Sequence, residues 1–475
     1  MFRLFLLILC IQWFSQCKPK EAMPVADEAS RMASADATFK KFCSTCHGDN
    51  GDVFVDRQWK HGRTRDSIMM NIRAGFPDLG MPKWDSVITE QEAADLADYL
   101  MKAIENRKKF DFQDSVRSSV FVHESMTVKL DTIARGLENP WGMAFLPNGD
   151  FLYTDRNGNL YRQSKGVQSM VKGAPQVVAE GQGGLLDVEL SPDFANNQTI
   201  YLSYSKLKDT AGQKLATTAV QKAKLSGNQI TGQKDIFIAM PYQKTRHHYG
   251  SRIEFDSTGF MFITVGDRGQ HMDSLPQKLD NDMGKVHRIR EDGSIPDDNP
   301  FYNTPGARKS IWSYGHRNLQ GMALQPGTNT IWTHEHGPRG GDELNIPEKG
   351  KNYGWPVISY GINYDGTILT PLTHKEGMEQ PLVRWVPSIG PSGLTFVKGN
   401  KYPAWEGDIL MGSLRFRYLE RVAIDGKTPG EKENLLKGIG RLRFVEMGPD
   451  GFIYVGVEEP GYIFRLLPVD NPSAN

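Results

Sequence analysis

The 475-residue chain has few cysteines and no excess of either charge. Four Cys are too few for a disulfide framework. The balance of 56 basic and 56 acidic residues argues against a nucleic-acid partner bound through bulk positive charge. Hydrophobic residues at 39% and charged residues at 24% exclude wholesale disorder. The 48 Gly and 27 Pro instead favour many turns, and therefore many short strands.

The N-terminus has the pattern of an export signal. A basic start at Arg3 precedes an apolar run over residues 4–14, which is shorter than the ~20 residues that span a bilayer. Cys17 ends this segment as in lipoprotein signals, although Phe14-Ser15-Gln16 departs from the usual preceding box. We therefore expect a signal peptide over 1–17, a flexible tether over 18–34, and a periplasmic protein anchored to the membrane by a lipid on Cys17. A buried helix at the start of the chain is the alternative.

The pentad Cys43-Ser44-Thr45-Cys46-His47 has the spacing of a c-type haem attachment site. Two thiols one helical turn apart can bond the two vinyl groups, and His47 can then coordinate the iron. A redox dithiol would not need His47, and a zinc site would need further Cys after Cys46, of which there are none. The pentad predicts covalent haem c.

The residues around the pentad predict a small all-α cytochrome c domain over 35–107. A helix is expected over 35–42, and Thr89 with Glu92 forms a capping box that opens another. Between them, Gly80-Met81-Pro82 resembles the class I cytochrome c loop, so Met81 is the expected second iron ligand. Met69 and Met70 compete for this role but lie in a helix-like run and are expected in the core. Residues 108–125 read as a linker.

From 126 to 468 one sequence pattern recurs: a predicted strand, a turn containing Gly, and a second predicted strand. Clear copies occupy 143–153, 253–263 and 444–454, and looser copies start near Leu186, Met322 and Leu394. Six hairpins at intervals of roughly 40–70 residues predict a six-bladed β-propeller. A β-sandwich would not require self-similar hairpins. Residues 469–475 read as a tail.

The loops between the repeats carry the polar chemistry. No nucleophile elbow, Walker loop or dinucleotide fingerprint is present in this region. Stretches rich in Arg, His and Gly occur instead at 181–187, 247–252, 315–318 and 334–343. Each residue alone has an ordinary explanation: His248 as a structural hydrogen-bonder, Arg317 as a surface ion pair, and His334 with His336 as polar loop residues.

Taken together these loops resemble one family. Gln-Gly-Gly-Leu-Leu, Gly-His-Arg-Asn, Glu-His-Gly-Pro and Asn-Tyr-Gly-Trp-Pro follow one another in the order of the soluble glucose dehydrogenases and aldose sugar dehydrogenases that use pyrroloquinoline quinone (PQQ). The resemblance runs from about Leu137 to Leu466. The His-His-x-Gly segment is closer to the aldose sugar dehydrogenase branch.

The resemblance implies a role for each loop. His248 matches the general base that takes the proton of the sugar C1 hydroxyl, and Gln182 matches a residue that contacts substrate and cofactor. The positions that match quinone-binding residues are Arg317, Asn318, Arg441 and Arg443. The carbonyl groups of Gly337 and Pro338 match ligands of the calcium ion on the quinone, and Glu343 and Tyr353 match ligands of a second calcium.

Two positions depart from the family. Arg415 replaces the usual Lys at a cofactor-binding position, and Glu458 replaces an Asp of the glucose enzymes. Both keep the charge, but Arg and Lys donate hydrogen bonds differently.

The expected protein is an exported quinohaemoprotein. It would oxidise an aldose at C1 to the lactone by hydride transfer to PQQ, pass the electrons to its own haem, and deliver them to an acceptor of the respiratory chain. Two alternatives stay open: a calcium-dependent propeller lactonase, and an electron-transfer scaffold without enzymatic activity.

Replacing both Cys43 and Cys46 by Ala should abolish haem staining on a denaturing gel, because only the thioether bonds hold haem to an unfolded chain. Staining that persists in the double variant would show that haem attachment does not use this pentad.

Overall fold

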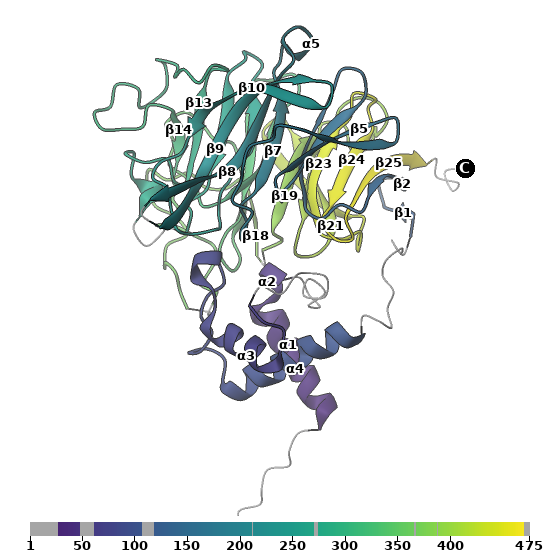
Figure 1. Cartoon of the computed structure of the whole chain (residues 1–475), viewed down its shortest axis with the longest axis vertical. Helices are drawn as coiled ribbons and strands as arrows, with labels where there is room; N and C mark the ends of the chain where they lie inside the picture. The colour runs from purple at the N-terminus through teal and green to yellow at the C-terminus, as the bar shows by residue number, and fades with distance from the viewer. Residues whose placement is uncertain are drawn as a thin grey trace, which may run out of the picture.

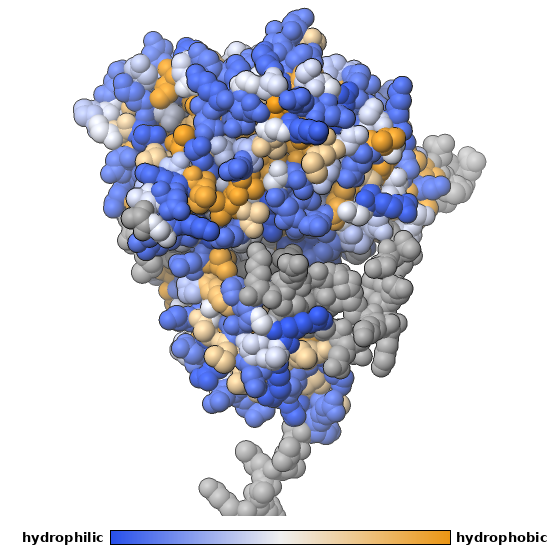
Figure 2. Space-filling model, in the orientation of Figure 1, coloured by the Kyte–Doolittle hydropathy of each residue, from blue (hydrophilic) through white to orange (hydrophobic). Residues whose placement is uncertain are grey.

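The chain folds into a helical domain followed by six β-sheets (Figure 1). This computed structural model describes residues 27–47, 61–106, 118–210, 212–269, 274–364, 367–386 and 388–469. The predicted signal peptide, Cys17 and most of the predicted tether lie outside these residues, as does the tail from 470. No helix in the described ranges is long and apolar enough to cross a membrane. Hydrophilic residues cover most of the face shown in Figure 2.

The helical domain packs its helices around one apolar core. Its elements are α1 (Glu28–Phe42), α2 (Ser44–His47), α3 (Arg65–Ala74), η2 (Pro77–Leu79) and α4 (Glu90–Asn106). Phe39, Leu96 and Leu100 are buried in this core. The predicted capping box is confirmed at the start of α4, where the Thr89 N–H donates to Glu92 Oε2 at 2.8 Å and the Glu92 N–H donates to Thr89 Oγ1 at 3.2 Å.

The tether prediction is wrong for residues 28–34, which are helical. Helix α1 begins at Glu28 because Asp27 caps it, its carboxylate accepting from the Ser30 N–H at 2.7 Å. Arg31 then binds Asp95 at 2.6 Å and Asp98 at 3.0 Å on α4. These ion pairs give the first turns of α1 a tertiary partner that the local sequence does not reveal.

The two competing methionines of α3 behave differently from one another. Met69 packs against the core, whereas Met70 is 66% exposed, so the prediction of a core position is wrong for Met70. Adjacent residues on a helix point about 100° apart, so only one of the two can face the core. Met81 packs against the same core as Cys43.

The six sheets form the blades of the predicted propeller, and the following strands make up the first three. The first contains β3 (Pro140–Phe145), β4 (Phe151–Asp155), β5 (Asn159–Ser164) and β6 (Val167–Val171). The second contains β7 (Leu185–Leu190), β8 (Thr199–Thr210), β9 (Gln213–Ser226) and β10 (Gln229–Ile238), with α5 (Phe194–Asn197) between β7 and β8. The third contains β11 (Ile253–Phe255), β12 (Met261–Val265), β13 (Lys285–Ile289) and β14 (Ile311–Tyr314), with η4 (Leu275–Gln277) between β12 and β13.

The remaining three blades follow the same order. The fourth contains β15 (Leu319–Leu324), β16 (Ile331–Glu335), β17 (Asp342–Asn345) and β18 (Val383–Trp385). The fifth contains β19 (Pro391–Phe396), β20 (Ile409–Ser413), β21 (Tyr418–Asp425) and β22 (Thr428–Leu435). The sixth combines β23 (Leu442–Met447), β24 (Ile453–Val457) and β25 (Tyr462–Val469) with β1 (Val120–Val122) and β2 (Thr127–Arg135).

The first two strands of each blade coincide with the six predicted hairpins. Met143 pairs with Tyr153 and Ile253 pairs with Ile263, as the repeated hairpin pattern requires. The first strands of neighbouring blades contact one another around the whole ring, from β3 through β7, β11, β15, β19 and β23 back to β3. They are therefore the innermost strands and surround the central channel.

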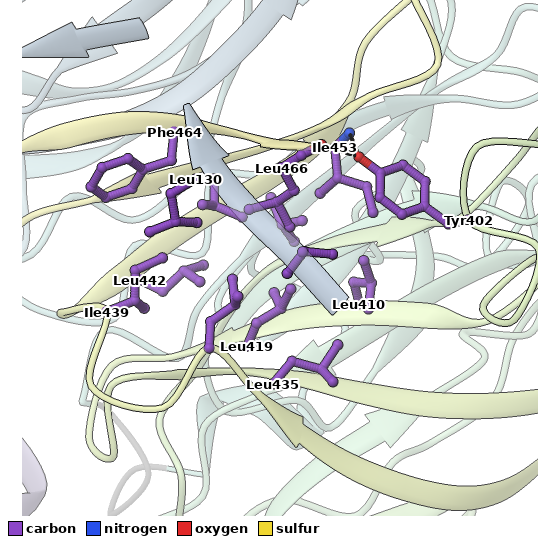
Figure 3. Close-up of a cluster of buried hydrophobic side chains, with 14 of the residues drawn as sticks. Leu130, Tyr402, Leu410, Leu419, Leu435, Ile439, Leu442, Ile453, Phe464 and Leu466 are labelled. Carbon is purple, nitrogen blue, oxygen red and sulfur yellow. Dashed lines mark hydrogen bonds between the residues drawn. The ribbon is translucent and has the colours of Figure 1, made fainter. Parts of the chain in front are cut away.

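The ring is closed by pairing the two ends of the propeller sequence. Strand β2 pairs antiparallel with β25 over nearly its whole length, and β1 pairs with β2. Figure 3 shows Leu130 of β2 among buried side chains from the C-terminal part of the chain, such as Leu442 and Phe464. The predicted linker 108–125 therefore contains the first strand of the propeller, and β25 runs one residue past the predicted end at 468. The short β1 lacks a repeat motif and acquires its structure only by pairing with β2.

Leu130→Ala should lower the free energy of unfolding of the propeller by about 2–5 kcal/mol, because the side chain is buried in the core that joins both ends of the ring. Urea unfolding followed by tryptophan fluorescence measures this. The neighbouring Lys129→Ala is the control, since Lys129 is exposed on the same strand. Equal small effects of both substitutions would show that β2 is not needed for closure.

Candidate active site

The predicted quinone and substrate residues gather at one end of the central channel. Gln182 precedes β7, His248 precedes β11, Asn318 precedes β15, and Arg443 lies at the start of β23. Hydrogen bonds connect these strand starts. The Gly250 N–H donates to Asn318 Oδ1 at 3.2 Å, and Arg443 Nη1 donates to Gln320 Oε1 at 3.2 Å. We call this end of the channel the mouth.

His248 forms a buried pair with Asp267, a residue that the sequence analysis missed. Its Nδ1 lies 2.7 Å from Asp267 Oδ1. Asp267 is fixed in turn by the Gly269 N–H at 2.7 Å and by Trp355 Nε1 at 2.8 Å. Because Nδ1 is bonded to the carboxylate, Nε2 is the ring nitrogen through which His248 would act as a base.

The Asp267 carboxylate stays ionised although it is completely buried. Burial raises its pKa, but the hydrogen bond of His248, the charge that this imidazole carries when protonated, and the charge of Arg317 outweigh this effect and hold the pKa below its ordinary value. Sequence reasoning did not single out Asp267, because it follows β12 and meets His248 only through the fold. An Asp in the Gly-Asp-Arg-Gly turn after a predicted strand was the one available signal.

Backbone geometry at His248 is held by Gln182. His248 has a φ of 54°, in the left-handed region that is rare for residues other than Gly. Its N–H donates to Gln182 Oε1 at 2.8 Å, while the Gln182 N–H donates to the Arg246 carbonyl at 2.7 Å. The two predicted catalytic residues are thus in direct contact, and the exposed Gln182 can reach a ligand in the mouth.

Arg441 and Arg443 share one carboxylate. Arg441 Nε lies 3.3 Å from Glu458 Oε2, and Arg443 Nε lies 2.7 Å from Glu458 Oε1. Burial lowers the pKa of the Arg443 guanidinium. Glu458, which departs from the Asp of the glucose enzymes, spans both guanidinium groups. Arg415 also lies at the mouth, where its Nη1 donates to the Ser388 carbonyl at 3.1 Å.

The donor groups of Arg317 and Asn318 fit an anionic ligand. Arg317 Nη1 donates to the Gly337 carbonyl at 2.5 Å, but its Nε has no partner among the described residues, and the same holds for Asn318 Nδ2. A buried donor without a partner costs about 1–3 kcal/mol. A quinone with three carboxylates would supply acceptors for both, so the residues at the mouth fit PQQ.

All four residues predicted to bind calcium line one small cavity of ≈10 Å³, together with Glu335. This volume admits a single particle the size of a water molecule. The carbonyl groups of Gly337 and Pro338 also accept from Arg317 and Ser388. Burial, and then the nearby Glu335, raise the pKa of Glu343 to about 8. In the described parts of the chain no three His, Cys, Asp or Glu side chains form a metal cluster, so a calcium ion here would depend on carbonyl ligands.

The imidazoles of His334 and His336 form hydrogen bonds with backbone carbonyl groups. Their Nε2 atoms lie 2.8 Å from the Gly393 carbonyl and 2.7 Å from the Pro391 carbonyl, respectively. The two imidazoles join the fourth blade to the fifth and do not form a chelate.

The opposite end of the channel contains a larger cavity of ≈750 Å³. Glu189, Glu254 and Glu446 line it near the ends of β7, β11 and β23. Burial raises the pKa of all three carboxyl groups, to about 7 for Glu254. The predicted site residues are not among those that line this cavity, so the two ends of the channel are chemically distinct.

The predicted haem ligands lie in two segments of the helical domain. Cys43 is the C-cap of α1, and the His47 N–H donates to its carbonyl at 3.0 Å, which places the pentad on α2. Met81 follows η2, and its backbone pairs with that of Phe76. The side chain of Cys46 lies outside the described residues. Cys43 and Met81 share one core, an arrangement that fits a haem between the two segments.

Comparison with known proteins matches both parts of the chain. Residues 137–465 match the family described as glucose/sorbosone dehydrogenase, and residues 30–100 match the family described as cytochrome c oxidase, cbb3-type, subunit III. Aldose sugar dehydrogenase YliI of Escherichia coli is 42% identical over 351 residues, which cover 72% of this chain and 93% of that protein.

The propeller is shared by solved structures, of which two serve as examples. The apo-form of the soluble aldose sugar dehydrogenase from Escherichia coli, at 41% identity, covers 72% of this chain and 100% of its own, with a TM-score of 0.69. The PQQ-bound form of aldose sugar dehydrogenase from Streptomyces coelicolor, at 29% identity, covers 72% of this chain and 98% of its own, with a TM-score of 0.59.

Asp267→Asn should lower the rate of aldose oxidation by ~10²–10⁴-fold, because an amide cannot keep the proton on Nδ1 and the Nε2 lone pair directed at the substrate. Steady-state kinetics with a small artificial acceptor measures this. Asp256→Asn is the matched control, since Asp256 is a buried aspartate in the turn after β11. A rate close to that of the parent would show that Asp267 does not orient the base.

Proposed function

Because the chain belongs to the glucose/sorbosone dehydrogenase family and carries a cytochrome c domain before the propeller, we propose that it oxidises aldoses at C1 and passes the electrons to its own haem. One observation carries the proposal: the His248–Asp267 pair lies at the same channel mouth as the unpartnered buried donors of Arg317 and Asn318. A base and an anion-binding pocket side by side are what the oxidation of a sugar by an anionic quinone requires.

The protein's own residues perform the proton transfer and the orientation. His248 Nε2 accepts the proton of the C1 hydroxyl, and Asp267 stabilises the imidazolium that results. Gln182, in contact with the His248 backbone, would bind the sugar. Bound PQQ supplies the hydride acceptor, and the product is the lactone. The arginines at the mouth, together with Asn318, would hold the quinone carboxylates.

The proposal includes a calcium ion bound in the small cavity beside Arg317. The carbonyl groups of Gly337 and Pro338 would bind it, with Glu343 and Tyr353 on the same cavity. A divalent ion there would also offset the charges of Glu335 and Glu343.

A haem bound in the helical domain would supply a one-electron acceptor and an exit for the electrons. Cys43 and Cys46 would bind it covalently, with His47 and Met81 as iron ligands. Fusion in one chain raises the effective concentration of this acceptor to about millimolar for a short linker. We further propose export by residues 1–17, a lipid anchor on Cys17, a periplasmic location, and a downstream acceptor in the respiratory chain.

The two alternatives explain fewer of the observations. A calcium-dependent lactonase would have no use for buried guanidinium groups that share Glu458. A scaffold without enzymatic activity would have no use for the His248–Asp267 pair.

When an aldose is mixed with the purified protein in the presence of calcium and PQQ, we expect the haem to become reduced. Absorption spectroscopy of the haem measures this, with omission of PQQ and the His248→Ala variant as controls. Hydrolysis of an added lactone without any change in the haem spectrum would instead establish the hydrolase.

A further inference from the structure

The helical domain lies next to the propeller (Figure 1), and its contacts place it at the mouth. The Arg246 N–H donates to the Asp78 carbonyl at 2.6 Å, which joins η2 of the helical domain to the residue two places before His248. Asp78 lies three residues before Met81, the predicted iron ligand. We call residues 76–82 the haem loop. A single backbone hydrogen bond thus connects the haem loop to the segment that carries the proposed base.

His247 fills the space between the haem loop and His248. A Cβ atom added to Gly80 would lie 3.3 Å from His247 Cγ, so the loop backbone packs directly on the imidazole. The His247 ring also meets the His248 ring edge to face, with centroids 4.5 Å apart. His247 is 8% exposed, and its Nδ1 has no hydrogen-bond partner among the described residues.

The pentad segment contacts the mouth as well. Arg415 Nη2 reaches Ser44 Oγ at 3.5 Å, and the Arg339 guanidinium lies 5.5 Å from the centroid of the Phe42 ring. Arg415 is a predicted cofactor-binding residue, and Ser44 follows Cys43. Both segments that would bind the haem iron therefore face the mouth where the quinone would bind.

We propose that His247 is a positioning residue for electron transfer: its imidazole seats the haem loop on the mouth and places the haem within direct reach of the quinone site. This inference rests on the proposed function. It gives His247 a role distinct from that of its neighbour His248. Burial lowers the pKa of His247 to about 3, so the ring is neutral and does not compete for the substrate proton.

The electron count fits repeated transfer through this contact. Each aldose oxidised to a lactone releases two electrons and two protons. The haem iron takes one electron at a time, from ferric to ferrous, so each turnover needs two transfers. A one-electron oxidant, such as a downstream cytochrome or ferricyanide, reoxidises the ferrous haem between them, and both protons pass to solvent.

His247→Ala and Gly80→Ala test the contact from its two sides. In the full chain loaded with calcium and PQQ, rapid mixing with an aldose gives the rate of haem reduction, and a small dye gives the rate of aldose oxidation without the haem. We expect haem reduction to slow roughly tenfold in either variant, as for truncation of a buried residue at the centre of an interface. Dye-linked oxidation should stay near that of the parent.

Three controls separate docking from other effects. The double variant should be no slower than the slower single variant, because both substitutions remove the same contact. The methionine-to-iron charge-transfer band must persist in Gly80→Ala. His123→Ala, which removes a half-buried imidazole near the sixth blade, should leave both rates unchanged.

Hydrogen exchange gives a readout that does not depend on activity. The Arg246 amide, which the Asp78 carbonyl protects, should exchange faster in both variants than in the parent. Unchanged exchange together with unchanged haem reduction would overturn the inference. Equal losses of haem-linked and dye-linked rates would also overturn it, because His247 would then act within the dehydrogenase site. If the parent reduces neither dye nor haem, the proposed function fails, and exchange alone decides whether His247 seats the loop.

Discussion

Burial of positive charge at the mouth is the constraint on which the rest of the site depends. Arg317, Arg441 and Arg443 are each more than nine-tenths buried, and guanidinium groups so close together repel one another and lose solvation. Glu458 offsets two of them, and the third donates to the Gly337 carbonyl and lies within the electrostatic influence of Asp267. These interactions leave some buried hydrogen-bond donors without acceptors, and an anionic cofactor can accept hydrogen bonds from them.

The propeller brings these groups together from distant parts of the chain. Each innermost strand begins at the mouth, so a residue placed just before or at the start of such a strand points to a common centre. Gln182 and Arg443 are far apart in sequence, yet both reach this centre through His248, Asn318 and Gln320. The sheets supply rigid positions, and the loops supply the chemistry.

The sequence predicted those parts of the structure that depend on short-range patterns. The six hairpins and the Thr89–Glu92 capping box were correct because strand alternation and turn residues are local signals. The start of α1 and the strand β1 were missed because both depend on partners far along the chain, α4 and β2. His248 was expected at the site from the family resemblance, but Asp267 was not, since no spacing rule connects it to His248.

The roles of the site residues remain predictions, whereas their convergence is a property of the fold. The sequence could name Arg441 and Arg443 as a pair on one side of a strand, because alternation along a strand fixes that. It could not show that Glu458 lies between them, or that the four expected calcium ligands share one cavity with Glu335. Such relations depend on how blades are joined around the ring.

The pairing of β2 with β25 has a consequence for biosynthesis. Asp131 and Arg465, which form an ion pair across these strands, are 334 residues apart. The helical domain has its internal contacts once residue 106 is made, and such local contacts form fast, whereas the pairing that seals the ring waits for nearly the whole chain. Until then β2 presents an unpaired strand edge, the kind of surface on which growing chains associate. The yield of folded protein should therefore depend on how quickly the last blade follows the first, and chaperones that shield strand edges would act mainly in that interval.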